Sequence, residues 1–179
     1  MPASLRPEDY RLLEPGPADG ARYLVCYQGG HPNTGPDRWL LREGGATREQ
    51  ALAVARDRIG RGWAFALAPA AVVDAPWPAV EPDAARTYTL DYDRFVVLVP
   101  SPRPSWLSAR RVAGPEGWDE VPAEPSLVVV VDGVEPDRSA ALARATRLGV
   151  RALVGRVTAI VDLEMGFEAG PLRKGAHLR

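Results

Sequence analysis

The stretch that decides the fold is SLVVVVDGVEPDRSAALARATRLGVRALVGRVTAIVDL, residues 126–163. Residues 127–131 form an uninterrupted aliphatic run, which is typical of a strand buried on both faces. Asp132 is expected to close this strand, and Pro136 suits the first position of a helix. Residues 151–163 predict another strand. The segment therefore predicts a strand–helix–strand unit, which would be a right-handed crossover if its strands are parallel in one sheet.

A similar helix is expected in the first half of the chain. There, Thr47 and Gln50 have the spacing of a capping box. With one gap, the helical segments REQALAVARDRIG (48–60) and RSAALARATRLG (138–149) share seven identical residues. One interpretation is a duplicated β-β-α-β unit, with a groove at the junction of its halves. The other is that two helices rich in Ala and Arg look alike through composition.

The chain divides into five segments around these two helices. They are an irregular N-terminal arm (1–20), a first β-β-α-β half (21–67), a connector rich in Ala and Pro (68–86), a second half (87–165) and a flexible tail (166–179). The connector is expected to hold neither a regular helix nor a central strand, because it contains four prolines. Together the segments predict one α+β domain: a mixed, mainly antiparallel sheet with two helices packed on one face.

Composition restricts the classes of partner and the compartment. The 179 residues carry a formal net charge of −1, which argues against nucleic acid and anionic membranes as partners. The chain has 21 Arg and 27 Ala but one Lys, which favours a bacterial protein from a high-GC genome. A lone cysteine, Cys26, and the lack of a secretory signal or of about 20 consecutive apolar residues favour the cytoplasm and no membrane span.

The segment GGHPNTGPD, residues 29–37, is a candidate ligand-binding loop. Glycine-rich loops can bring backbone N–H groups close to a phosphate, and a histidine can add a proton donor. The candidate ligand-binding residues are Gly29, Gly30, His31, Asn33 and Thr34. The spacing matches no nucleotide-binding motif, so a surface connector is the alternative. A nucleophilic pair of Cys26 and His31 is disfavoured, because Cys26 lies within an apolar strand.

Carboxylates follow two of the expected strands. Asp132, Asp162 and Glu164 could hold a Mg²⁺ ion through oxygen ligands if the sheet brings these strand ends together. The simpler interpretation is that charged residues belong at strand ends, and that Asp132 favours the following helix N-terminus. No cofactor is therefore predicted.

Aromatic and basic residues outside the expected core are candidates for a contact surface. Trp106, Arg110, Arg111 and Trp118 surround a Pro-Glu-Gly turn that predicts a short hairpin, and Trp77 lies in the proline-rich connector. Trp and Arg are frequent at binding hot spots. The alternative is that these Trp side chains pin loops onto the sheet.

Charge is separated along the second half of the chain. Residues 112–137 hold seven acidic side chains and no basic one, whereas residues 138–160 hold five arginines and no acidic one. Spacing of i, i+3 and i+7 predicts that Arg144, Arg147 and Arg151 share one helix face. This face could bind an acidic partner or a phosphate backbone. Alternatively, it is a solvated face that the neighbouring acidic segment neutralises.

These observations favour a non-catalytic protein-interaction or regulatory protein, because no catalytic constellation emerges while an unusual surface does. A small-molecule or phosphate-binding protein, including an enzyme, that uses residues 29–37 is the first alternative. Nucleic-acid binding through the arginine face is the second. A protein partner is expected, and homo-oligomerisation stays open.

Overall fold

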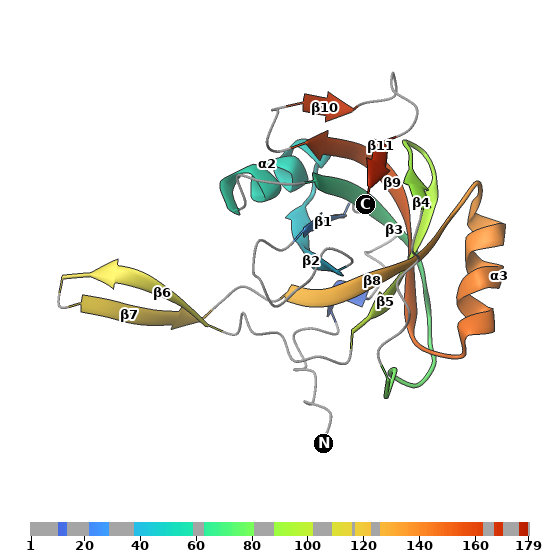
Figure 1. The fold of residues 1–179 in the computed structure, drawn as a ribbon, viewed down its shortest axis with the longest axis horizontal. Coiled ribbons are helices and arrows are strands. Elements are labelled where there is room, and N and C mark those ends of the chain that lie inside the picture. The colour runs from blue at the N-terminus through green and yellow to red at the C-terminus, as the bar shows by residue number, and fades with distance from the viewer. Residues whose placement is uncertain are drawn as a thin grey trace.

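Six antiparallel strands close into a barrel (Figure 1). The computed structural model describes residues 11–13, 22–28, 38–58, 63–80, 88–101, 109–115, 117–122, 126–162, 167–169 and 176–178. The barrel strands are β1 (Tyr23–Gln28), β2 (Arg38–Gly45), β3 (Trp63–Val73), β5 (Phe95–Pro100), β8 (Ser126–Glu135) and β9 (Ala152–Asp162). Their order is β9-β3-β1-β2-β8-β5, and β5 pairs again with β9, so the sheet has no open edge there.

Alternation along each strand separates an inner core from an outer one. Successive side chains of a strand point to opposite faces, so every second residue enters the barrel. Residues from all six strands fill the interior: Leu24, Cys26, Trp39, Leu41, Phe65, Leu67, Val96, Leu98, Leu127, Val129, Val131, Leu153, Val157 and Ile160. The largest of them, Trp39, meets Phe65 edge to face with ring centroids 5.0 Å apart. The interior is thus a packed core of side chains.

Two helices cover different parts of the outer surface (Figure 1). Helix α2 (Arg48–Arg58) buries Ala51, Leu52 and Ala55 in a cluster with outward residues of the barrel strands. Helix α3 (Arg138–Leu148) buries Ala141 and Ala145 in a second cluster, with outward residues of β5 and β9. Alanine on both buried faces lets each helix approach the strands closely.

The helix ends follow from local sequence. Thr47 Oγ1 accepts from the backbone N–H of Gln50 at 3.1 Å, and Gln50 Oε1 accepts from that of Thr47 at 3.2 Å, which confirms the capping box. Asp137 caps α3 by accepting from the Ala140 N–H at 2.8 Å. Gly149 ends α3 in the left-handed conformation at φ 66°, where glycine has no Cβ penalty. Pro136 therefore precedes the cap, and its predicted place at the first helical position is wrong.

Each half of the barrel has the same order of elements. In the first, β1 lies between β2 and β3, and α2 connects β2 to β3. In the second, β5 lies between β8 and β9, and α3 connects β8 to β9. The strands flanking each helix are both antiparallel to the strand between them, so they are parallel to each other. The halves meet through β2–β8 and β3–β9 pairs.

Three sequence-based expectations about the sheet are wrong. All pairings between the described strands are antiparallel, so the sheet is not mixed. Strand β3 continues to Val73, inside the predicted connector, because Pro69 lies beyond the part of β3 that pairs with β1 and next to a register shift opposite β9. Strand β8 continues past Asp132 to Glu135, because a bulge opposite residues 97 and 98 absorbs one residue.

Short elements from both ends of the chain pack onto the barrel. The 3-10 turn η1 (Arg11–Leu13) buries Leu12 and Leu13 in the interior cluster, so the predicted arm contains an ordered turn. In the predicted tail, β10 (Phe167–Ala169) pairs with β9, and β11 (Ala176–Leu178) pairs with β4 (Tyr88–Leu90). Strand β4 ends at Leu90, because the chain turns at residues 91–94.

Strands β6 (Ala109–Gly114) and β7 (Gly117–Pro122) form a separate two-stranded sheet, which confirms the predicted hairpin. We call residues 109–122 the ribbon. Figure 1 shows the ribbon projecting from the barrel on the side away from α3. No other described strand pairs with it.

Candidate functional site

The structure describes only some of the candidate residues. The proposed ligand loop at residues 29–37, Trp106 and Glu164 lie outside the described residues. Asp162 is described as the last residue of β9, by its backbone alone. The ribbon places Arg110, Arg111 and Trp118 in register with Val121, Glu120 and Ala113, respectively. The surface that can be built from geometry therefore comprises the ribbon, α3 and the segment after β3.

The ribbon interrupts a connection that could be short. Strands β5 and β8 are antiparallel neighbours, with Pro100 opposite Val129 and a 2.8 Å hydrogen bond from the Ser101 N–H to the Val128 carbonyl. Neighbours of this kind are usually joined by two to five residues. Here, residues 102–125 separate them, and the ribbon lies within that segment. Connections longer than about 12–15 residues are uncommon in compact domains, and those that occur are often functional.

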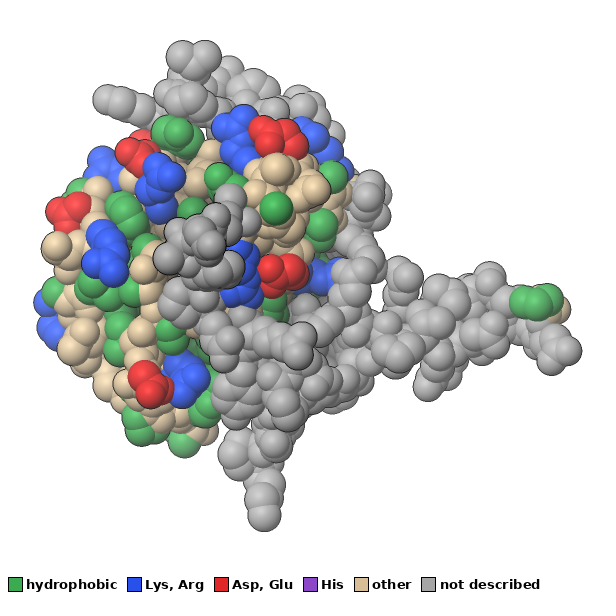
Figure 2. Space-filling model, turned by 180° about the vertical axis from the view of Figure 1, so that it is seen from behind, with side chains coloured by type: hydrophobic (Ala, Val, Ile, Leu, Met, Phe, Trp, Pro, Cys, Tyr) green, Lys and Arg blue, Asp and Glu red, His purple; other side chains and the backbone are tan. Residues whose placement is uncertain are grey.

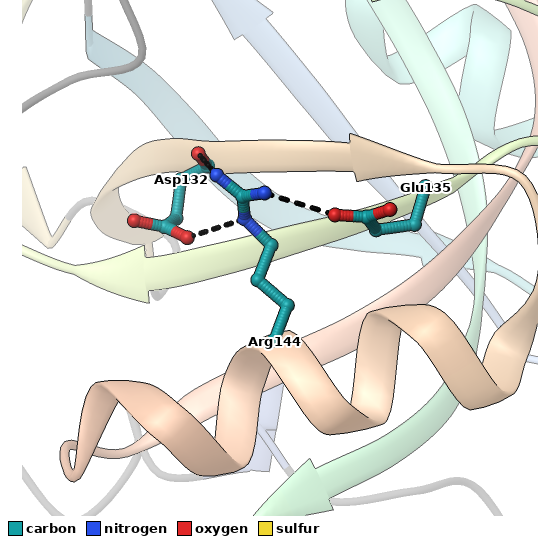
Figure 3. Close-up of polar contacts among 3 residues, drawn as sticks. All are labelled: Asp132, Glu135 and Arg144. Carbon is teal, nitrogen blue, oxygen red and sulfur yellow. Dashed lines mark hydrogen bonds and ion pairs between the residues drawn. The ribbon is translucent and has the colours of Figure 1, made fainter.

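Arg144 fastens α3 to β8 (Figure 3). Its Nε donates to Asp132 Oδ2 at 2.7 Å, its Nη2 to the Asp132 carbonyl at 2.9 Å and its Nη1 to Glu135 Oε1 at 2.9 Å. Hydrogen bonds to Asp132 and then Glu135 raise the pKa of the Arg144 guanidinium. The acidic strand end and the basic helix thus neutralise each other within one molecule at this point. Asp132 therefore anchors α3 to β8 by accepting hydrogen bonds from Arg144.

The shared arginine face predicted from sequence is wrong. Helix α3 ends at Leu148, and the chain turns at Gly149, so Arg151 lies beyond the helix. Arg144 points to β8, while Arg147 is exposed in the last turn of α3. The 3.6-residue period that aligns the three arginines is lost at the helix end. On the face shown in Figure 2, the described basic and acidic side chains are interspersed rather than gathered into one patch.

Arg151 instead holds the segment that follows β3. Its Nη2 donates to Asp74, its guanidinium carbon lies 4.9 Å from the ring centroid of Trp77, and its backbone N–H donates to the Pro76 carbonyl at 3.0 Å. The side chain of Trp77 is half-buried against the interior cluster. From the sequence, Trp77 is interpreted either as part of a contact surface or as a residue that pins a loop onto the sheet. Its contacts are those of a residue that pins a loop. Sequence reasoning missed Asp74 as a partner, because it is 77 residues away.

The described carboxylates do not gather around a metal position. Within the described parts of the chain, no group of three or more His, Cys, Asp or Glu residues is arranged to hold an ion. Of the three carboxylates proposed from sequence, only the Asp132 side chain is described, and it accepts from Arg144.

Gly133 lies directly beneath the Arg144 guanidinium, a contact that sequence reasoning missed. A Cβ at Gly133 would overlap the Arg144 guanidinium, so the arginine would have to leave Asp132 and Glu135. We expect Gly133→Ala to lower the free energy of unfolding by about 1–2 kcal/mol, since partly exposed ion pairs contribute about 1 kcal/mol or less each. In an Arg144→Ala background, the same substitution should cost less than about 0.5 kcal/mol. Urea unfolding of the four proteins measures this coupling, and equal costs in both backgrounds would contradict it.

Comparison of the chain with known protein families, with curated proteins and with solved structures finds no match. In the parts of the chain that the structure describes, neither helix has the length and apolar character needed to cross a membrane.

Proposed function

We propose that the protein is a non-catalytic protein-interaction module that binds a partner protein through its ribbon. The observation that carries the proposal is the insertion of residues 102–125 between β5 and β8, which are already neighbours. The barrel gains no described strand pairing from it.

The composition and form of the ribbon support a binding role. Its sequence, ARRVAGPEGWDEVP, contains Trp118 and two consecutive arginines, residue types frequent in binding hot spots. An isolated two-stranded hairpin is at best marginally stable in water, and it gains stability from additional strands or a packing partner. The barrel supplies a rigid base, since its interior is filled by side chains from every strand.

The test is partner capture with and without the ribbon. We expect a tagged full chain, purified from its native host, to retain one protein at constant stoichiometry. A variant with residues 109–122 replaced by Gly-Ser-Gly should keep the barrel folded, as judged by circular dichroism and melting temperature, and should lose that protein. Retention of the same protein by the ribbon-less variant would overturn the proposed function.

A matched control addresses the arginine alternative. Arg147 is exposed on α3, away from the ribbon, and it forms no hydrogen bond or ion pair with another described residue. Arg147→Glu should leave partner capture unchanged. If Arg147→Glu abolished capture and the bound material were nucleic acid lost steeply with added salt, the phosphate-binding alternative would replace the proposal.

We further propose that the barrel arose from a duplicated β-β-α-β unit. Two features support this. Both halves have the same strand order around their first strand, and they join through equivalent strands, β2 with β8 and β3 with β9, as a twofold relation requires. In this arrangement, residues 29–37 and residues 102–125 occupy the same connection in their respective halves. The ribbon is then a late elaboration of a connection that is short in the first half.

A further inference from the structure

We propose that the outer edge of β6 accepts an extended, acidic segment of the partner protein as a third strand. This inference rests on the proposed function, because it specifies how the ribbon would bind. Binding by strand addition uses main-chain hydrogen bonds for affinity and flanking side chains for specificity. Neither edge of the ribbon pairs with another described strand, and the register of the ribbon distinguishes the two edges.

The register fixes which backbone groups face outward. The pair that flanks the turn is Gly114 and Gly117, and a pair in this position exchanges both of its hydrogen bonds. Hydrogen-bonded and non-hydrogen-bonded pairs then alternate along the ribbon. The non-hydrogen-bonded pairs are Ala113 with Trp118, Arg111 with Glu120, and Ala109 with Pro122.

The two edges therefore differ in donors. At the β6 edge, Ala109, Arg111 and Ala113 each direct one N–H and one C=O away from β7. At the β7 edge, Pro122 has no N–H and leaves a gap in the row. Proline on an edge strand is a common device that prevents strand addition. The edge of β6 is thus the one able to form a complete ladder.

Charge along β6 selects the partner. Strand β6 carries Arg110 and Arg111 and no acidic residue, whereas β7 carries Asp119 and Glu120, with Glu120 opposite Arg111. The outer edge of β6 therefore borders the basic strand of the ribbon. Consecutive residues of a strand lie on opposite faces, so a partner strand needs a carboxylate on each face to meet both arginines. An extended segment with two consecutive acidic residues fits.

A second copy of the chain is a poor occupant of this edge. Antiparallel pairing of two β6 edges about Arg111 would place the Arg111 side chains of the two copies directly opposite each other, and like charges in this position are destabilising. Pairing of a β6 edge with the β7 edge of another copy would meet Pro122 and would propagate without closing. Both observations favour a different protein as the donor of the strand.

The test uses the full chain and a defined probe. The probe is a dye-labelled peptide, Thr-Val-Glu-Glu-Val-Thr, and its counterpart has lysine in place of both glutamates; binding is followed by fluorescence anisotropy. We expect binding of the acidic peptide alone. Arg110 lies opposite Val121 rather than an acidic residue, so Arg110→Glu creates no pair of opposed acidic residues within the ribbon. Arg110→Glu should weaken binding about tenfold, since the change removes an attraction to the peptide and adds a repulsion. Arg147→Glu makes the same charge change far from the ribbon and should have no effect.

A second pair of variants separates backbone pairing from charge. Ala113→Pro removes one outward N–H of the β6 edge, at a position where an edge strand tolerates proline, and should weaken binding about tenfold. Ala113→Thr keeps that N–H and should bind as the unchanged chain does. Equal binding by these two variants, or equal binding of the two peptides, would overturn strand addition at β6.

The native partner separates this inference from the proposed function. If partner capture requires residues 109–122 but is unchanged by Arg110→Glu and Ala113→Pro, the ribbon binds in another way and only the edge inference fails. If partner capture does not require residues 109–122, the proposed function fails. If all three variants lose the partner while Ala113→Thr keeps it, both stand.

Discussion

Trp39→Ala is expected to lower the free energy of unfolding by about 4 kcal/mol, which is a large part of the stability of a domain of this size. The Trp39 side chain is 1% exposed and is among the largest fully buried side chains in the barrel. Trp39 on β2 contacts Phe65 on β3, and β1 lies between these two strands in the sheet. The neighbouring strands close into a ring, so they cannot collapse freely into the cavity. Urea unfolding followed by circular dichroism measures the loss.

The matched control for this prediction is Val80→Ala. Val80 is 80% exposed, and its truncation should change the free energy of unfolding by less than about 0.5 kcal/mol. A loss below about 1.5 kcal/mol for Trp39→Ala would mean that the interior around Trp39 is loosely packed. The barrel would then not be a rigid base for the ribbon, and the proposed function would lose that support.

Local elements are predictable here because short-range rules specify them. The Thr47–Gln50 capping box depends on residues three positions apart, and it has the expected geometry. The hairpin around residues 115–117 is also a local feature. Closure of the barrel is different. It depends on β9 pairing with β3 and with β5, contacts between distant segments that no period within one strand encodes.

The candidate site shows the same division. The aromatic and basic composition of the ribbon is visible in the sequence, but its meaning depends on β5 and β8 being neighbours. The arginine face failed because period alone does not say where a helix ends. Charge separation predicted that the two segments could neutralise each other, and Arg144 does so with Asp132 and Glu135. The sequence left open whether the basic helix binds an acidic partner or is neutralised by the acidic segment. Only the fold shows that Arg144 is neutralised within the molecule.

Cys26 is expected to react with iodoacetamide at least about 1,000-fold more slowly in the folded protein than in urea. Its side chain is fully buried inside the barrel, and burial raises the pKa of the Cys26 thiol. The reactive species is the thiolate, so low access and a raised pKa both suppress reaction. Because the barrel is closed, exposure of Cys26 requires unfolding, whose equilibrium constant sets the protection. Mass spectrometry of the alkylated fraction over time measures both rates.

The same burial makes stability depend on alkaline pH. In the unfolded chain the thiol ionises near its ordinary pKa of 9.0, whereas in the barrel it stays neutral. The contribution of Cys26 to stability is therefore constant well below pH 9 and falls as the pH rises above it, because only the unfolded state loses its proton. Cys26→Ala should lose this extra decline between pH 8 and 10 while keeping any shared with other groups. Rapid alkylation of the folded chain, or identical pH profiles, would place the thiol within reach of solvent. Burial of Cys26 would then no longer argue against a nucleophilic pair of Cys26 and His31.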